Sequence, residues 1–314
     1  MTSGLTSSAP VVITPAVETT SMVNELTAEQ ARMAKLESEI STGHAVITAS
    51  DDPAQASNIL QLQASVTRAN QFAANAQDGA SWLSLGNSTL SSVMDVLQNV
   101  QSAVAGLTGD LLSGTQSAVA GVATVVTGAL QQLIDLANTQ YGGQAIFSGT
   151  GDPTQAYSTT GVYLGAGNAP TRTVAPGTLV SVSVTGPAVF GTGTTGLLSK
   201  VPGNLGVLAQ IAADLSSGTP ARLESAATTG LGALEAAMSR VAAQAAKLGA
   251  DEQAMQGFSS QATASATALT EELSNAQDVN IAQAITDLQL QQSSYQAALS
   301  VISKVSADSL AQYL

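Results

Sequence analysis

Acidic residues that stand next to each other are the first candidates for chemistry. Asp51 and Asp52 are adjacent, and a pair of carboxylates can bind a metal ion or act as a general acid and base. However, Pro53 follows directly, and an aspartate before a proline is a typical helix start, in which the carboxylate caps the first turn. The sequence therefore predicts a helix cap at this position and not an active site.

The other candidate groups are weaker. Glu271, Glu272 and Asp278 lack the glycine and the alternating oxygen ligands of a calcium loop, so they indicate a solvated helix face. His44 is the only histidine and cysteine is absent. Neither a zinc site nor a Ser-His triad therefore has support. We expect no metal, no cofactor and no enzymatic activity.

The segment from Gly191 to Gly196, Gly-Thr-Gly-Thr-Thr-Gly, has the glycine content of a phosphate-binding loop. A phosphate loop also requires a following Lys-Ser/Thr pair between a strand and a helix, and neither is present here. We expect a flexible return segment.

Composition and charge exclude further classes. The net charge is −13, and no Lys or Arg lies between Arg68 and Arg172 or between Lys247 and Lys304. Nucleic-acid binding needs clustered cations, so we expect none. Residues 111–134 carry no charge but contain eight Ser, Thr and Gln residues, and we expect no membrane span. The chain shows no secretory signal.

The helices that would position any site follow a coiled-coil pattern. From Ile59 to Val104, residues spaced alternately three and four apart are apolar except Asn87 and Gln101. This spacing puts them on one seam of a long helix, roughly 69 Å for 46 residues. A second seam of equal length runs from Leu231 to Ala276. Two seams of equal length favour an antiparallel pair.

Shorter helices complete the prediction. The same spacing predicts helices from about Thr20 to Ile40, over residues 115–139, from Leu205 to Leu215, and from Ile281 onward. The domain organisation that we expect is a disordered tail (1–20), an N-terminal helical segment (21–147), a β-rich insert (148–203) and a C-terminal helical segment (204–314). The fold class is thus mainly α, a long antiparallel coiled-coil or helical-bundle rod with a small β-rich inserted domain.

The insert is predicted from its change of composition. Val180, Val182 and Val184 alternate with serines, which is the period of a half-buried strand. Residues 162–164 and 172–174 are further short strands, and Gly177 and Gly186-Pro187 read as turns.

Four motifs in this order resemble the bacterial flagellin family, over residues 11–314. They are Ser50-Asp51-Asp52-Pro53-Ala54, residues 137–143 (Ala-Asn-Thr-Gln-Tyr-Gly-Gly), residues 146–150 (Ile-Phe-Ser-Gly-Thr) and residues 309–314 (Ser-Leu-Ala-Gln-Tyr-Leu). The chain is most similar to the family members found at the hook–filament junction, because of its Ser-Asp-Asp-Pro-Ala segment and its Ser-Leu-x-x-Tyr-Leu ending. The family motif positions are Ser50, Asp51, Asp52, Pro53, Asn138, Phe147, Gly149, Ser309, Tyr313 and Leu314.

The resemblance implies a structural, extracellular part of the flagellum, exported by the type III apparatus without a cleaved signal peptide. It implies ring assembly with copies of itself, and contacts with a neighbouring hook-associated protein, flagellin and an export chaperone. The terminal helices would form the assembly interface through their apolar stripes: Leu26, Met33, Leu36, Ile40, Ile281, Ile285, Leu288, Tyr295, Leu299, Ile302, Val305 and Leu310.

Two alternatives stay open. The chain could be filament flagellin itself, which shares the architecture. It could also be a secreted adhesin or binding module that carries the β-rich insert on a helical stalk.

Overall fold

The computed structural model describes residues 15–108, 116–151 and 154–311, and side chains within 20–107, 116–151 and 154–304. Contacts group the chain into two compact units. Unit 1 combines Met1–Val66 with Thr267–Leu314, and unit 2 is the continuous segment Thr67–Ala266. Most of the predicted tail, residues 1–14, lies outside the described residues.

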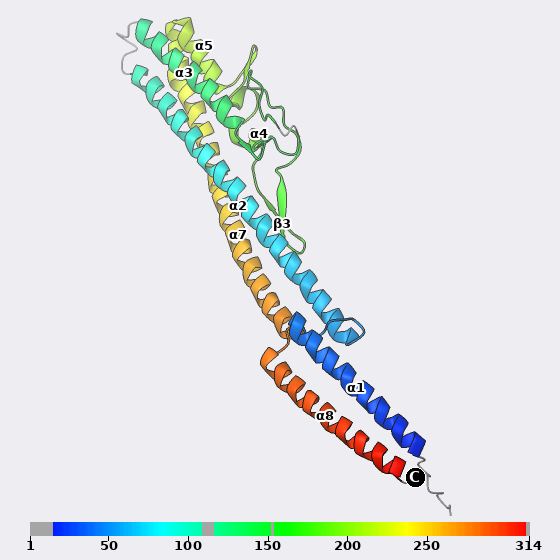
Figure 1. The fold of residues 1–314 in the computed structure, drawn as a ribbon. Helices are drawn as coiled ribbons and strands as arrows, with labels where there is room; N and C mark the ends of the chain where they lie inside the picture. Colours follow the sequence, from blue (N-terminus) through cyan, green and yellow to red (C-terminus); the bar gives the residue numbers. More distant parts are fainter. Residues whose placement is uncertain (1–14, 109–115, 152–153, 312–314) are drawn as a thin grey trace, which may run out of the picture. The chain divides into compact units, whose positions relative to one another are not determined.

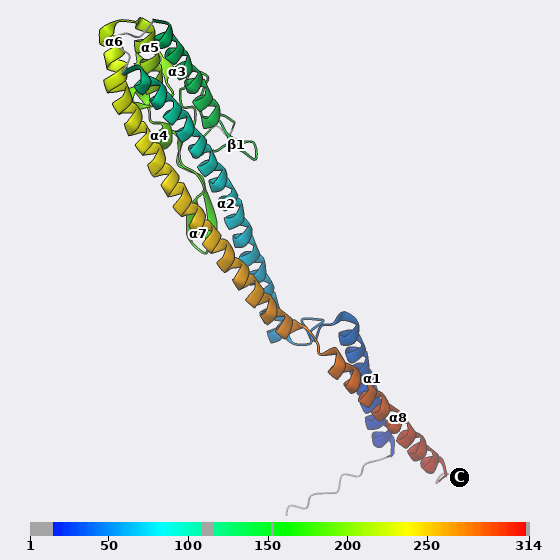
Figure 2. The ribbon, with the colours of Figure 1, turned by 90° about the vertical axis from the view of Figure 1, so that its left-hand side faces the viewer.

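Unit 1 contains a pair of helices from distant parts of the sequence. Helix α1 (Pro15–Thr42) and helix α8 (Ile281–Ala311) lie side by side in opposite directions (Figure 1, Figure 2). Gln30 Nε2 donates a hydrogen bond of 2.8 Å to Tyr295 Oη across the pair. α1 begins five residues before the predicted start at Thr20. Gly43 follows its end with φ 75°, a left-handed conformation that favours glycine after a helix.

Unit 1 also contains a short extended link after α1. The Ala45 N–H donates to the Gln277 carbonyl (2.8 Å), and the Val279 N–H donates to the Gly43 carbonyl (2.9 Å). This pairing joins the link to the break between helix α7 (Leu231–Gln277) and α8. The helical stretch from residue 231 to the end of α8 is therefore interrupted by a break between Gln277 and Ile281.

The two predicted seams pair along α2 and α7, and most of their residues belong to unit 2. Helix α2 (Pro53–Thr108) lies beside α7 in the opposite direction (Figure 1). All fourteen predicted seam positions of α2 and all fourteen of α7 are buried or half-buried. The two polar α2 seam residues have partners on α7, because Asn87 Nδ2 donates to Glu252 (2.7 Å) and Gln101 Nε2 donates to Glu235 (3.3 Å). The antiparallel coiled-coil prediction is confirmed.

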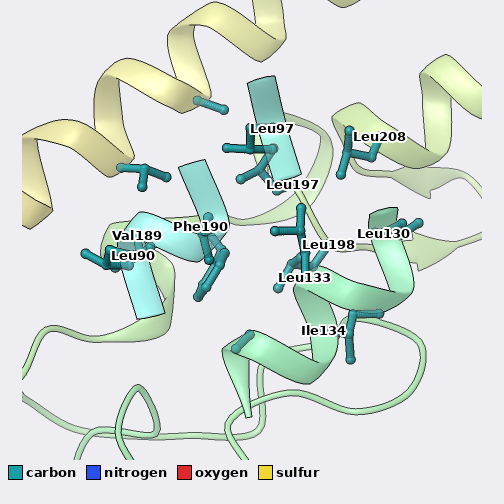
Figure 3. Packing of buried hydrophobic residues seen from close by; sticks show 14 of the residues in the cluster. Leu90, Leu97, Leu130, Leu133, Ile134, Val189, Phe190, Leu197, Leu198 and Leu208 are labelled. Carbon is teal, nitrogen blue, oxygen red and sulfur yellow. The ribbon is translucent and has the colours of Figure 1, made fainter. Parts of the chain in front are cut away.

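Further helices pack around this pair. Helix α3 (Gln116–Ala137) packs against α5 (Val207–Ser217), and α6 (Pro220–Ser225) leads through a π-helical turn at Ala226–Gly230 into α7. Figure 3 shows Leu133 of α3, Leu97 of α2 and Leu208 of α5 directed into a common core. This core belongs to unit 2.

α3 includes most of the uncharged stretch at residues 111–134. Among the described residues it is the one helix with the length and hydropathy that could cross a membrane, and 39% of its most apolar window is buried. Its buried side chains, which include Val126, Leu130 and Leu133, face the core of unit 2. Residues 111–115 of the stretch lie outside the described residues.

The insert consists of short antiparallel hairpins and loops around a common core. The pairs are β1 (Gln140–Tyr141) with β2 (Gln144–Ala145), β3 (Thr171–Ala175) with β4 (Thr178–Ser181), and β5 (Lys200–Val201) with β6 (Asn204–Leu205). The predicted strand at 172–174 and the turn at Gly177, φ 73°, are confirmed. The mainly α fold with a small β-containing insert is confirmed.

Three details of the insert differ from the prediction. Val182 and Val184 are buried but follow the end of β4, because the apolar core and not a neighbouring strand covers them. Residues 162–164 contribute an isolated bridge between Tyr157 and Tyr163. Gly186-Pro187 is not a turn but the start of helix α4 (Gly186–Phe190), since proline also fits the first turn of a helix.

Candidate assembly surface

The predicted apolar stripe of α1 faces α8. Leu26, Met33, Leu36 and Ile40 are all half-buried, and between them lie the exposed residues of the opposite side of α1. The three-four spacing therefore identified the contact face of this helix correctly.

The predicted stripe of α8 divides into two parts. Leu288, Tyr295 and Ile302 are half-buried and face α1. Ile281, Ile285 and Leu299 are 50%, 42% and 43% exposed. On a helix with 3.6 residues per turn, the exposed three lie roughly 60° around the axis from the other three. The side chains of Val305 and Leu310 lie outside the described residues.

The α1–α8 pair has an incomplete core. Among the described side chains, none in α1 is buried and only Ala284 in α8 is buried. In contrast, the part of α2 within unit 2 buries Leu83, Leu90 and Leu97 completely. The seams of this pair are half-buried and large apolar side chains stay exposed. Apolar burial within one copy therefore contributes little to the stability of the pair.

A groove of about 470 Å³ lies between α1 and α8. The groove has apolar and charged lining residues: Met22, Glu25, Leu26, Ala28, Glu29 and Arg32 from α1, and Ala298, Val301 and Ile302 from α8. Oε2 of Glu29 is buried in the structure without a hydrogen-bond partner. The groove therefore combines apolar walls with a carboxylate oxygen that water does not reach.

The family motif at residues 50–53 forms the start of α2. Oδ1 of Asp52 accepts hydrogen bonds from the N–H groups of Ala54 (3.0 Å) and Gln55 (2.9 Å), so the predicted helix cap is confirmed. Asp51 accepts a hydrogen bond from the Thr48 N–H (3.0 Å), and this bond lowers the pKa of the Asp51 carboxyl below 3.8.

Ser50 and Pro53 complete the same turn. The hydroxyls of Ser50 and Thr48 lie 2.9 Å apart within hydrogen-bond distance, and Pro53 is the first residue of α2. The motif is thus a structural element that ends the link and starts the long helix.

The motif positions in residues 137–150 hold the insert together. Asn138 makes three hydrogen bonds: Nδ2 donates to the Tyr157 carbonyl (2.9 Å), and Oδ1 accepts from the N–H groups of Ala156 (2.9 Å) and Tyr157 (2.8 Å). The ring of Phe147 is fully buried and meets Phe190 edge to face at 5.5 Å.

Gly149 has a clear reason to be glycine. Its φ is 70°, and an added Cβ would lie 2.6 Å from the Ala166 carbonyl oxygen, so both the backbone and the close approach exclude a side chain. Of the remaining motif positions, Tyr313 and Leu314 lie outside the described residues. Ser309 is inside α8, but its side chain is outside them.

Two arginines that the sequence prediction missed tie the insert to the long helices. Arg172 of β3 forms an ion pair with Asp78 of α2 (Nε to Oδ2, 2.9 Å) and lies over the ring of Trp82 at 5.5 Å. Arg240 of α7 donates to the carbonyls of Val189, Phe190 and Thr195 at 3.1, 3.5 and 3.3 Å. The glycine-rich segment after Phe190 is therefore fastened to α7, which contradicts the expected flexible return.

Among the described residues, no group of three or more His, Asp or Glu side chains could hold a metal ion. Burial raises the pKa of the Tyr157 hydroxyl and that of Tyr163. His44 lies 3.6 Å from Asp278 across the link and the α7–α8 break, where it joins two elements of unit 1.

Comparison with known proteins agrees with this geometry. The family model for the bacterial flagellin N-terminal helical region matches residues 13–152. The resemblance to the bacterial flagellin family is confirmed. The matched region contains all of α1, α2 and α3 and the motif residues 137–150, so it includes the motifs at residues 50–54, 137–143 and 146–150.

Two individual relatives carry the same name, flagellar hook-associated protein 3. Over 181 residues the chain is 28% identical to flagellar hook-associated protein 3 of Escherichia coli (strain K12). Over 183 residues it is 30% identical to flagellar hook-associated protein 3 of Salmonella typhimurium (strain LT2). Each match covers 57% of this chain and 56% of the relative. The match thus spans little more than half the length of these curated relatives.

A solved structure supports the fold. The structure of a putative flagellar hook-associated protein from Vibrio parahaemolyticus has a TM-score of 0.62 and 21% sequence identity. The match covers 73% of this chain and 100% of that one. The two chains therefore share a fold over the matched part.

Proposed function

We propose that this chain is a structural component of the bacterial flagellum that links the hook to the filament. The observation that carries the proposal is the incomplete core of the α1–α8 pair, whose exposed apolar side chains require neighbours from other molecules. The relatives named flagellar hook-associated protein 3 supply the setting. The role is mechanical and non-enzymatic, and the chain assembles into a ring with copies of itself.

The other partners and the location of the chain follow from this proposed role. The ring contacts a neighbouring hook-associated protein on one side and flagellin on the other. Before assembly, an export chaperone covers the exposed apolar stripe of α8, which has the layout of a helix that binds in a groove. The chain leaves the cell through the flagellar export channel without a cleaved signal peptide and resides outside the cell.

Electron microscopy of a strain that lacks the chain tests this function against filament flagellin. Loss of a junction protein leaves hooks without filaments, with flagellin released into the medium. Loss of one flagellin leaves the hook tip and its associated proteins in place. Normal filaments in the deletion strain would refute both readings and favour an adhesin.

Removal of residues 292–314 tests the role of α8. This change deletes Tyr295, Leu299 and Ile302 and leaves all of unit 2, so we expect a soluble chain that no longer assembles or restores filaments. Replacement of the exposed Gln292 and Gln296 by alanine is the matched control, and it should assemble normally. Rings or filaments formed by the truncated chain would show that α8 is not the assembly surface.

A further inference from the structure

One carboxylate oxygen in the groove between α1 and α8 has no hydrogen-bond partner within the single chain. Oε2 of Glu29 is buried without a hydrogen-bond partner, between apolar wall residues such as Leu26 and Ile302. A carboxylate removed from water is costly unless a cation or a donor compensates it. The groove is therefore a surface that fits an incoming helix with an apolar row and one positive charge.

The cations of unit 1 near this groove are few. Among the described side chains of α1 and α8, they are Arg32, Lys35 and Lys304. Lys35 pairs with Glu39 one turn further along α1 (3.8 Å). Arg32 lines the groove, but no ion pair joins it to Glu29 in the described structure. Lys304 is exposed on α8.

Lys304 belongs to an exposed row that matches the groove. It follows Ile302 by two residues, so it lies on nearly the opposite side of α8 from the face that contacts α1. Leu290, Ala297, Val301 and Lys304 are spaced by seven, four and three residues, and all four are exposed, Leu290 by 67% and Val301 by 54%. This spacing forms one stripe along a helix, apolar with a single cation at its end.

We infer that the α1–α8 groove receives this α8 row from a second copy of the chain, with the partner copy's lysine paired with Glu29. The inference rests on the self-assembly proposed above and names the contact that performs it. The groove and the row are different surfaces of the same molecule, and such a heterologous contact repeats from copy to copy and generates a ring or a helical array. Val301 stands at the edge of both surfaces.

Zero-length cross-linking tests the contact directly. Equal amounts of ¹⁵N-labelled and unlabelled full-length protein are mixed under assembly conditions, treated with a carbodiimide and analysed by peptide mass spectrometry. We expect a Glu29–Lys304 amide with peptides of both isotopes. Lys304→Arg keeps the charge but removes the amine, so it should assemble and give no such product. Single-isotope products alone, or inter-copy products that never include Glu29, would overturn the inference.

Charge reversal gives a second, independent test. Glu29→Lys and Lys304→Glu should each raise the protein concentration needed for assembly by on the order of tenfold, and the double variant should restore it. Circular dichroism confirms that each variant is helical. If the wild type itself fails to assemble, the proposed function fails with the inference. If it assembles and the double variant shows no rescue, the inference alone is wrong and the groove has a different occupant.

Discussion

Asn138 shows what a family motif position does at the scale of one residue. Its side chain fixes the backbone of Ala156 and Tyr157 through three hydrogen bonds, close to the fully buried hydroxyl-bearing ring of Tyr157. A loop held by one amide side chain depends on both the donor and the acceptor of that side chain. The motif therefore marks a structural clamp of the insert.

Asn138→Ala should destabilise unit 2. Three partly buried hydrogen bonds lose their partner, which we expect to cost about 3 kcal/mol of unfolding free energy. Denaturant titration followed by circular dichroism measures the change. Gln140→Ala removes one exposed hydrogen bond, to the Thr154 carbonyl, and should cost less than about 1 kcal/mol. Equal losses for the two variants would show that Asn138 is no clamp.

Asp51 provides a prediction for pH. Its folded-state pKa lies below 3.8, because the carboxylate accepts the Thr48 N–H and the Thr48 side chain also lowers it. A depressed pKa stabilises the folded link above the unfolded pKa, and this contribution disappears as the pH falls through the folded value. An NMR titration of the Asp51 carboxyl carbon should have a midpoint below 3.8, and a midpoint above 3.8 would contradict the assignment.

The sequence predicts the roles of residues whose partners are close in the chain, but not the roles of residues whose partners are far away in it. The cap at Asp52 follows from the neighbouring proline, and the confirmed bonds to Ala54 and Gln55 are within the first turn. The ion pair of Arg172 with Asp78 joins residues 94 positions apart. Nothing in the local sequence selects that partner, because the contact exists only after β3 has packed on α2.

At the scale of elements, the α2–α7 pair combines a thin apolar seam with polar contacts. Asn87 and Glu252 occupy facing seam positions and are both half-buried. Small residues allow close packing elsewhere, since an added Cβ at Gly86 would lie 3.1 Å from Leu248. In coiled coils a polar seam residue fixes the register at a cost in stability. We expect the Asn87–Glu252 contact to have this role here.

Asn87→Leu should destabilise unit 2 by about 1–3 kcal/mol, because it leaves the Glu252 carboxylate in the seam without its donor. The double variant Asn87→Leu with Glu252→Leu should recover that loss or exceed it, since the polar pair is replaced by apolar packing. Thermal unfolding measures both effects. A double variant less stable than the single one would show that the pair contributes net stability beyond register.

The helices could be predicted because their periodicity is local. Every predicted seam position of α2 and α7 is at least half-buried, and the spacing of residues on one helix decides this. For the insert, the sequence predicted short strands but not their arrangement. That arrangement depends on Phe147, Phe190 and Tyr157, which pack together from separate segments. The candidate site was predicted in part. α8 has the expected apolar stripe, but only one side of that stripe contacts α1. The groove between the two helices is visible only in the structure.

At the scale of the whole molecule, the two units differ in completeness. Unit 2 is one continuous segment, Thr67–Ala266, and contains the cluster of fully buried residues around Leu97, Leu133 and Leu208. The α1–α8 pair has half-buried seams and needs neighbours. Stability should therefore be concentrated in unit 2.

A fragment of residues 67–266 should fold by itself. We expect cooperative thermal unfolding with a midpoint close to that of the main transition of the full chain. In the full chain, amide hydrogen exchange in α1 and α8 should be faster than in the α2 and α7 segments of unit 2. A fragment without a cooperative transition, or equal protection in all four helices, would contradict this division.

The α1–α8 pair also affects how the chain is made. Gln30 and Tyr295, which meet across the pair, are 265 positions apart. At about 5–20 residues per second, a ribosome needs tens of seconds to complete the intervening segment. Throughout that time the nascent polypeptide presents the apolar stripe of α1 without its partner helix, whereas unit 2 has all its residues before Tyr295 is added. Translation thus provides a built-in delay during which the early helix is open to any other binder in the cytosol.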